Sequence, residues 1–102
     1  AVGPTKSLYS KANRGSFIDI AAPGVGIWTA RQGGGASYQS GTSFAVPFAV
    51  LKTALILAGE KGRKNLSPEF IRSQFAKEAI DLGAEGKDPL FGFGLLQFKN
   101  CL

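Results

Sequence analysis

The longest apolar stretch of the chain covers residues 42–58, where only Lys52 and Thr53 interrupt the pattern. A surface helix shows one apolar stripe, whereas a helix that is apolar nearly all round is buried on several sides. Gly59 follows the stretch and is a natural helix end. The pattern therefore predicts a buried helix. A membrane span needs about 20 apolar residues, so we expect this helix to be too short and too interrupted to cross a bilayer.

A second helix is predicted to begin after Ser67. Ser67 is an N-cap residue type, Pro68 suits the first helical position, and Glu69 is favourable at the positive end of a helix. An apolar stripe at helical spacing follows, formed by Phe70, Ile71, Phe75 and Ala79, which Leu82 could extend. We expect this helix to end within residues 81–86.

Shorter apolar segments lie on either side of the first helix. We predict strands over residues 16–22 and 25–30, a glycine-rich loop over 32–37, and a turn with a short strand over 91–98. Trp28 and the phenylalanines are expected in the core. Strands before and after a buried helix give an α/β fold class. Because so few elements can hardly enclose the first helix, we expect part of its cover to lie outside this chain.

Length and composition set limits on the classes of function. A chain of 102 residues with 44% hydrophobic and 19% charged residues is typical of one folded domain. The formal net charge of +5 invites a nucleic-acid interpretation, but the basic residues are dispersed, and the one cluster, 61–64, is better interpreted as a solvated loop. Cys101 is the only cysteine and is expected to be an incidental thiol. The absence of methionine indicates a processed product or an excised piece.

Candidate chemistry lies at the start of the first helix. Gly41 permits a tight turn, Thr42 and Ser43 are helix-capping types, and Pro47 is expected in the first helical turn. A serine at a helix start has its own N–H unpaired and lies at the positive end of the helix dipole. That position suits a nucleophile whose attack generates an oxyanion. Taken alone, a serine here is more often only a helix cap.

Three segments together resemble one family. Residues 41–47, Gly-Thr-Ser-Phe-Ala-Val-Pro, resemble the active-site serine motif of the subtilisin-like serine proteases, Gly-Thr-Ser-x-Ala-x-Pro. Residues 17–25 are similar to the Ala-Pro-Gly segment that precedes this serine, and 91–97 to the C-terminal Tyr-Gly-x-Gly-hydrophobic segment. The three occur in the family's order and span nearly the whole chain. Phe44 and Val46 depart from the methionine and the small residue usual at these positions.

The resemblance implies that residues 1–102 are the C-terminal fragment of one catalytic domain built on a doubly wound parallel sheet. Ser43 would be the nucleophile, its backbone N–H one oxyanion donor, and Gly41 and Thr42 the shapers of the turn. The family order is Asp, His, Ser, so the two partners are expected before Ala1, as is an asparagine oxyanion donor. The chain contains no histidine. We therefore expect a serine endopeptidase whose fragment is inactive alone.

The resemblance implies a peptide or protein substrate and the missing N-terminal part of the domain as partners. Because the first helix lacks cover, we also expect the fragment to self-associate or to pair with that missing part. The dispersed basic residues and the short, interrupted apolar run predict no nucleic-acid and no membrane partner. Calcium binding is common in the family, but no ligand cluster is legible, and we expect no cofactor. An extracellular or cell-envelope location is implied. Without a histidine to orient, Asp19 is expected to be a strand-end or surface carboxylate. The second hypothesis is a non-catalytic relative that serves as a binding or scaffold module. The third is a basic nucleic-acid-binding module.

Overall fold

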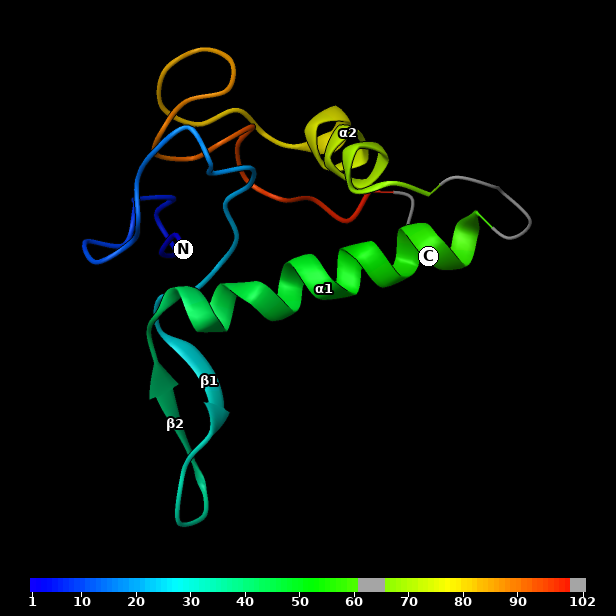
Figure 1. The fold of residues 1–102 in the computed structure, drawn as a ribbon. Helices are drawn as coiled ribbons and strands as arrows, with labels where there is room; N and C mark the ends of the chain where they lie inside the picture. Colours follow the sequence, from blue (N-terminus) through cyan, green and yellow to red (C-terminus); the bar gives the residue numbers. More distant parts are fainter. Residues whose placement is uncertain (61–65, 100–102) are drawn as a thin grey trace.

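The computed structural model describes residues 1–60 and 66–99, which form two strands and two helices. The cluster 61–64 and Cys101 lie outside the described residues. In chain order the elements are β1 (Ile27–Ala30), β2 (Ala36–Gln39), α1 (Thr42–Gly59) and α2 (Pro68–Glu78). Figure 1 shows the β1–β2 hairpin projecting from the start of α1, while α2 and the loops lie along the other side of that helix. Helices and strands together are compatible with part of an α/β domain.

Isolated β-bridges join segments of the chain that are far apart in sequence. Val2 pairs with Pro23 and Ala21 with Leu95 in parallel, and Leu95 also pairs with Ile80 in antiparallel. Parallel bridges are compatible with the predicted parallel sheet, but the regular strand predicted over 16–22 is wrong. Its first residues form a turn instead, in which the Ile18 N–H donates to the Gly15 carbonyl at 3.2 Å.

The glycines of the segment 91–97 allow this close crossing. A Cβ built on Gly94 would lie 2.1 Å from the Ile80 carbonyl oxygen, and one on Gly92 would lie 2.3 Å from the backbone of Asp19. Real Cβ atoms do not approach other atoms so closely. Glycine is therefore required at both positions by the close approach of Gly92 to Asp19 and of Gly94 to Ile80.

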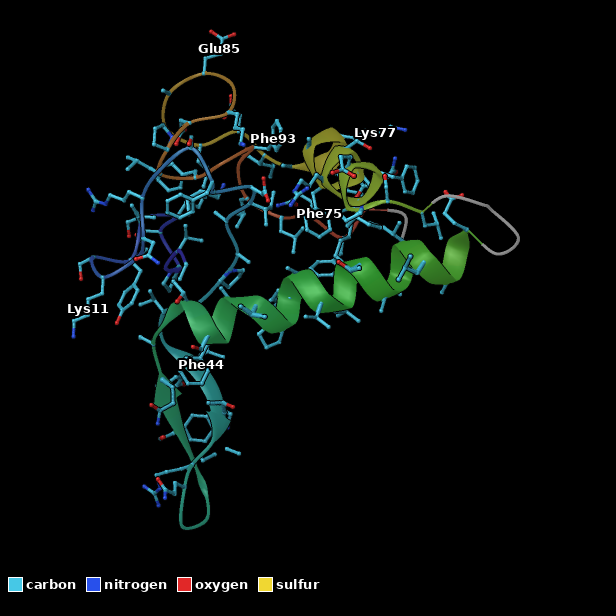
Figure 2. All side chains as sticks on the ribbon, viewed as in Figure 1. Lys11, Phe44, Phe75, Lys77, Glu85 and Phe93 are labelled. Atoms are coloured by element: carbon cyan, nitrogen blue, oxygen red, sulfur yellow. The ribbon has the colours of Figure 1, made fainter. Side chains whose placement is uncertain are left out.

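The core lies where α1, α2 and these bridged segments meet. Its buried residues are Ala22, Ala45, Phe75 and Leu96. Figure 2 shows Phe75 in the space between α2 and α1. As predicted, Ser67 caps α2, and its hydroxyl accepts the Phe70 N–H at 3.1 Å. The helix ends at Glu78, earlier than expected, because Ile80 leaves it to pair with Leu95.

The prediction that α1 is a buried helix is wrong for the chain as it stands. Only Ala45 and Lys52 are buried, whereas Val46, Val50 and Leu57 are 56%, 59% and 43% exposed. The physical reason is that α2 and the bridged segments cover one face of α1, and no other described element covers the rest. By length and composition α1 could cross a membrane, with 6% of its apolar window buried. Length alone therefore does not exclude a membrane span.

The β1–β2 hairpin is antiparallel, with Trp28 opposite Tyr38. Their rings meet edge to face, with centroids 4.9 Å apart. Trp28 is 63% and Phe17 67% exposed, so the expectation that both lie in the core is wrong. Strand β1 lies within the predicted range. Strand β2 was missed, because residues 36–39 carry little apolar pattern and follow three glycines.

Candidate functional site

Ser43 is the second residue of α1, and Gly41 is the helix N-cap. Both Thr42 and Ser43 are exposed, and no side-chain hydrogen bond caps the helix. The Phe44 N–H donates to the Gly41 carbonyl at 3.1 Å, which closes the first turn. The first four N–H groups of a helix have no intrahelical partner, so the Ser43 N–H is available at the positive helix end. A hydroxyl and a backbone N–H donor therefore lie together at the helix start, and these are the groups that an oxyanion-forming reaction can use.

The segment Ala22-Pro23-Gly24 is fixed against this turn. The Gly41 N–H donates to the Gly24 carbonyl at 2.7 Å. In turn, the Gly24 N–H donates to the Val2 carbonyl and the Val2 N–H to the Ala22 carbonyl, each at 3.0 Å. The two motifs recognised separately in the sequence are therefore joined by a direct backbone hydrogen bond.

The hairpin is also fixed at its base, next to the candidate nucleophile. The Ser40 hydroxyl accepts the Gly26 N–H at 2.9 Å, just beyond the last strand pair, Ile27 and Gln39. Sequence reasoning missed Ser40. The only signal was a hydroxyl residue next to the turn glycine, and such a residue has many other uses.

Pro47 does not lie in the first helical turn as expected; it is the sixth residue of α1. A proline here has no N–H to give to the carbonyl four residues earlier. That carbonyl belongs to Ser43. The proline therefore interrupts the regular helical bonding at the residue that carries the candidate chemistry.

A hollow of about 270 Å³ lies beside the first half of α1. Thr42, Ala45, Val46 and Ala49 form its wall on the helix, and Phe17 and Ile18 lie on the other side. Ser43 does not line it. Phe44 is half-buried and lies where α1 meets the hairpin, as Figure 2 shows. The hollow is thus an apolar space next to the helix start, and it does not contain the serine.

Asp19, the acidic residue considered in the sequence, is paired with two basic side chains. Asp19 accepts from the Arg72 guanidinium at 3.0 Å and lies 3.7 Å from the Lys87 ammonium. Asp19 is thus a half-exposed carboxylate, in agreement with the expected surface position, and its ion pairs were not predicted. Within residues 1–60 and 66–99 no three His, Cys, Asp or Glu side chains gather to hold a metal ion. The chain itself supplies no histidine base for Ser43.

Comparison with known proteins shows to which class of protein the chain is related. No family model matches the chain. By similarity over nearly its whole length, however, it is related to the subtilisin-like serine proteases. It is 36% identical over 98% of its length to subtilisin-like protease 1 of Pseudogymnoascus destructans.

Two particular relatives extend the match to bacteria. The chain is 31% identical to the minor extracellular protease Epr of Bacillus subtilis over 97% of its length. It is 33% identical to the thermophilic serine proteinase of a Bacillus species, strain AK1, over 100% of its length. The matched region makes up 15% of the Epr sequence, and 24% of both subtilisin-like protease 1 and the thermophilic serine proteinase. The chain thus spans a quarter or less of the length of these three relatives.

Proposed function

We propose that this chain is the C-terminal part of a subtilisin-like catalytic domain that hydrolyses peptide bonds through an acyl-enzyme on Ser43. The observation that carries the proposal is the exposed Ser43 at the second position of α1, within a chain whose relatives are proteases. We call the longer protein that would contain this chain the parent protein. In it, the remaining residues would complete a doubly wound parallel sheet around α1.

In the proposed reaction, the Ser43 hydroxyl oxygen attacks the carbonyl carbon of the scissile peptide bond. A histidine of the parent protein accepts the hydroxyl proton, and the Ser43 N–H donates to the oxyanion that forms. The intermediate then collapses, the amine leaves with the proton from the histidine, and the acyl group remains on Ser43 as an ester. Water, deprotonated by the same histidine, hydrolyses that ester. Gly41 and Thr42 shape the turn that holds Ser43.

The isolated 102-residue chain is expected to have no measurable peptidase activity. A serine hydroxyl is a weak nucleophile without an adjacent base, and the chain has no histidine. In subtilisin itself, removing the serine or the histidine lowers kcat by about 10⁶-fold. Peptide hydrolysis by the purified chain that disappears in Ser43→Ala would contradict this expectation.

The decisive experiment is labelling of the parent protein with a fluorophosphonate, followed by mapping of the labelled peptide by mass spectrometry. We expect the label on Ser43, no label in Ser43→Ala, and full labelling in the control Ser73→Ala, which removes an exposed hydroxyl on α2. A folded parent protein that takes no label would favour the alternative, a non-catalytic relative that serves as a binding or scaffold module. Ser43 would then be only a residue of the helix start.

The uncovered face of α1 supports a further part of the proposal. Exposed apolar surface and open strand edges favour association, so the isolated chain is expected to self-associate or to pair with the remainder of its domain. A clean monomer by light scattering would count against this. The extracellular designation of Epr supports an extracellular location for the parent protein. Substrates would be peptides or proteins, and no nucleic acid is proposed as a partner.

A further inference from the structure

Gly24 is the point at which the 22–24 segment meets the turn that carries Ser43. Its carbonyl accepts the Gly41 N–H at 2.7 Å, the shortest backbone hydrogen bond of this region. Gly41 in turn accepts the Phe44 N–H at 3.1 Å. Ser43 lies in the chain between Gly41 and Phe44, the two residues that this second hydrogen bond joins. The position of its N–H and hydroxyl therefore depends on where Gly24 holds Gly41.

The structure leaves no room for a side chain at Gly24. A Cβ there would lie 2.8 Å from the Gly41 carbonyl oxygen, 3.2 Å from the Ala45 Cβ and 2.5 Å from the Ala1 Cβ. Gly24 is not among the glycines with positive φ. Space, rather than backbone conformation, is therefore what requires glycine at this position. Two of the three neighbours belong to the N-cap and first turns of α1.

We propose that Gly24 is a positioning residue for Ser43, an inference that rests on the proposed function. Its missing side chain lets the 22–24 segment touch the helix start, and its carbonyl then fixes the Gly41 amide. Adding one methyl group would push Gly41 and the turn outward by some tenths of an ångström. A misplacement of about 1 Å at a catalytic group can cost about 100-fold in rate, so we expect a loss of about 10-fold for this smaller shift.

The test compares three variants in the parent protein. Gly24→Ala introduces all three close contacts. Ala1→Gly combined with Gly24→Ala removes the contact to Ala1 and keeps the one to the Gly41 carbonyl. Gly3→Ala is the matched control, because a Cβ there meets only ordinary contacts, at 3.6 Å from Val25 and 3.7 Å from Ser7. Each variant is checked for folding by circular dichroism. The rate of fluorophosphonate labelling at Ser43, and kcat and KM for a peptide, are then measured well below the melting temperature.

We expect both Gly24 variants to lose about 10-fold in labelling rate and in kcat with KM unchanged, while Gly3→Ala stays within twofold of the unaltered protein. Restoration of the rate by Ala1→Gly would overturn the proposal, because the contact that mattered would then be with Ala1. So would an unchanged rate in folded Gly24→Ala, or a failure of both Gly24 variants to fold. If the unaltered parent protein is not labelled at Ser43, the proposed function itself fails, which separates the two conclusions.

Discussion

Replacing Glu78 with glutamine is expected to destabilise the protein through a lysine on another helix. Lys52 is the only charged residue of α1, and it is 2% exposed. Its ammonium forms an ion pair with the Glu78 carboxylate on α2 and lies 6.0 Å from the centre of the Phe98 ring. Glutamine keeps the size and a hydrogen-bonding oxygen but removes the negative charge. The charge of Lys52 would then be buried without the negative charge of Glu78 beside it.

The magnitude follows from the burial of the two side chains. Removing one partner of a buried ion pair typically costs about 3–5 kcal/mol. We expect about 3 kcal/mol for Glu78→Gln, because a quarter of the Glu78 side chain is already exposed and the pair is not fully enclosed. Lys52→Met should cost less, since Glu78 is then able to turn toward water. Lys52→Met with Glu78→Leu should recover most of the stability, as is found when buried pairs become apolar.

Urea unfolding followed by circular dichroism measures these differences. The variants are made in the parent protein carrying Ser43→Ala, so that self-digestion does not distort the curves. The reasoning is refuted if Glu78→Gln loses less than about 0.5 kcal/mol, the size of an ordinary surface substitution. It is also refuted if Lys52→Met costs more than Glu78→Gln, because the order of the two variants follows from their different exposure.

Three further predictions use the same unfolding measurement. Gly94→Ala should lower the free energy of unfolding by more than about 2 kcal/mol, since its Cβ would lie 2.1 Å from a backbone oxygen. Gly59→Ala should cost nothing, because a Cβ there meets no atom within 4 Å. Equal effects of the two variants would contradict the packing argument. Ser67→Ala should cost about 1 kcal/mol through loss of the α2 cap; an unchanged free energy of unfolding would show that the cap adds no stability. Val50 is exposed in this chain, yet Val50→Glu should cost more than about 2 kcal/mol in the parent protein. A neutral effect there would argue against a covering layer over α1.

The sequence allowed good predictions where the signal is local. Pro68 after Ser67 located the start of α2, and the capping bond is present. The long apolar run located α1 to within one residue at its end. These features depend on neighbouring residues alone, so one sequence is enough to recognise them.

Features that depend on distant contacts were predicted less well. Residues 16–22 alternate as a strand does, yet the backbone there is divided between a local turn and a crossing with residues 93–96. Strand β2 has a weak apolar pattern and is held by pairing with β1. The turn residues Gly41, Thr42 and Ser43 were recognised by motif, but their anchoring to Gly24 is set by tertiary contact. Periodicity carries no information about such a bond.

The apolar sequence of α1 predicts a buried helix, but in this chain one face of the helix is exposed. Helix α1 buries its one charged residue, Lys52, and exposes Val46, Val50 and Leu57, which lie on a common face at spacings of four and seven residues. A helix of 18 residues is about 27 Å long, close to the thickness of a bilayer core. In a membrane, however, a lysine near the middle would cost about 3 kcal/mol, whereas here Lys52 already has its carboxylate on α2.

The apolar hollow lies beside Val46 and Ala49 in the first half of α1. Phe17 and Ile18, which belong to a loop, also line it. Fully burying one valine or leucine stabilises a protein by about 1.5–3 kcal/mol. Covering the half-exposed Val46, Val50 and Leu57 would therefore stabilise the folded domain by about 3 kcal/mol. A bilayer would have to accommodate the buried Lys52, whereas protein side chains can cover the valines and fill the hollow. Both features therefore favour a cover made of protein, as the proposed remainder of the domain would provide.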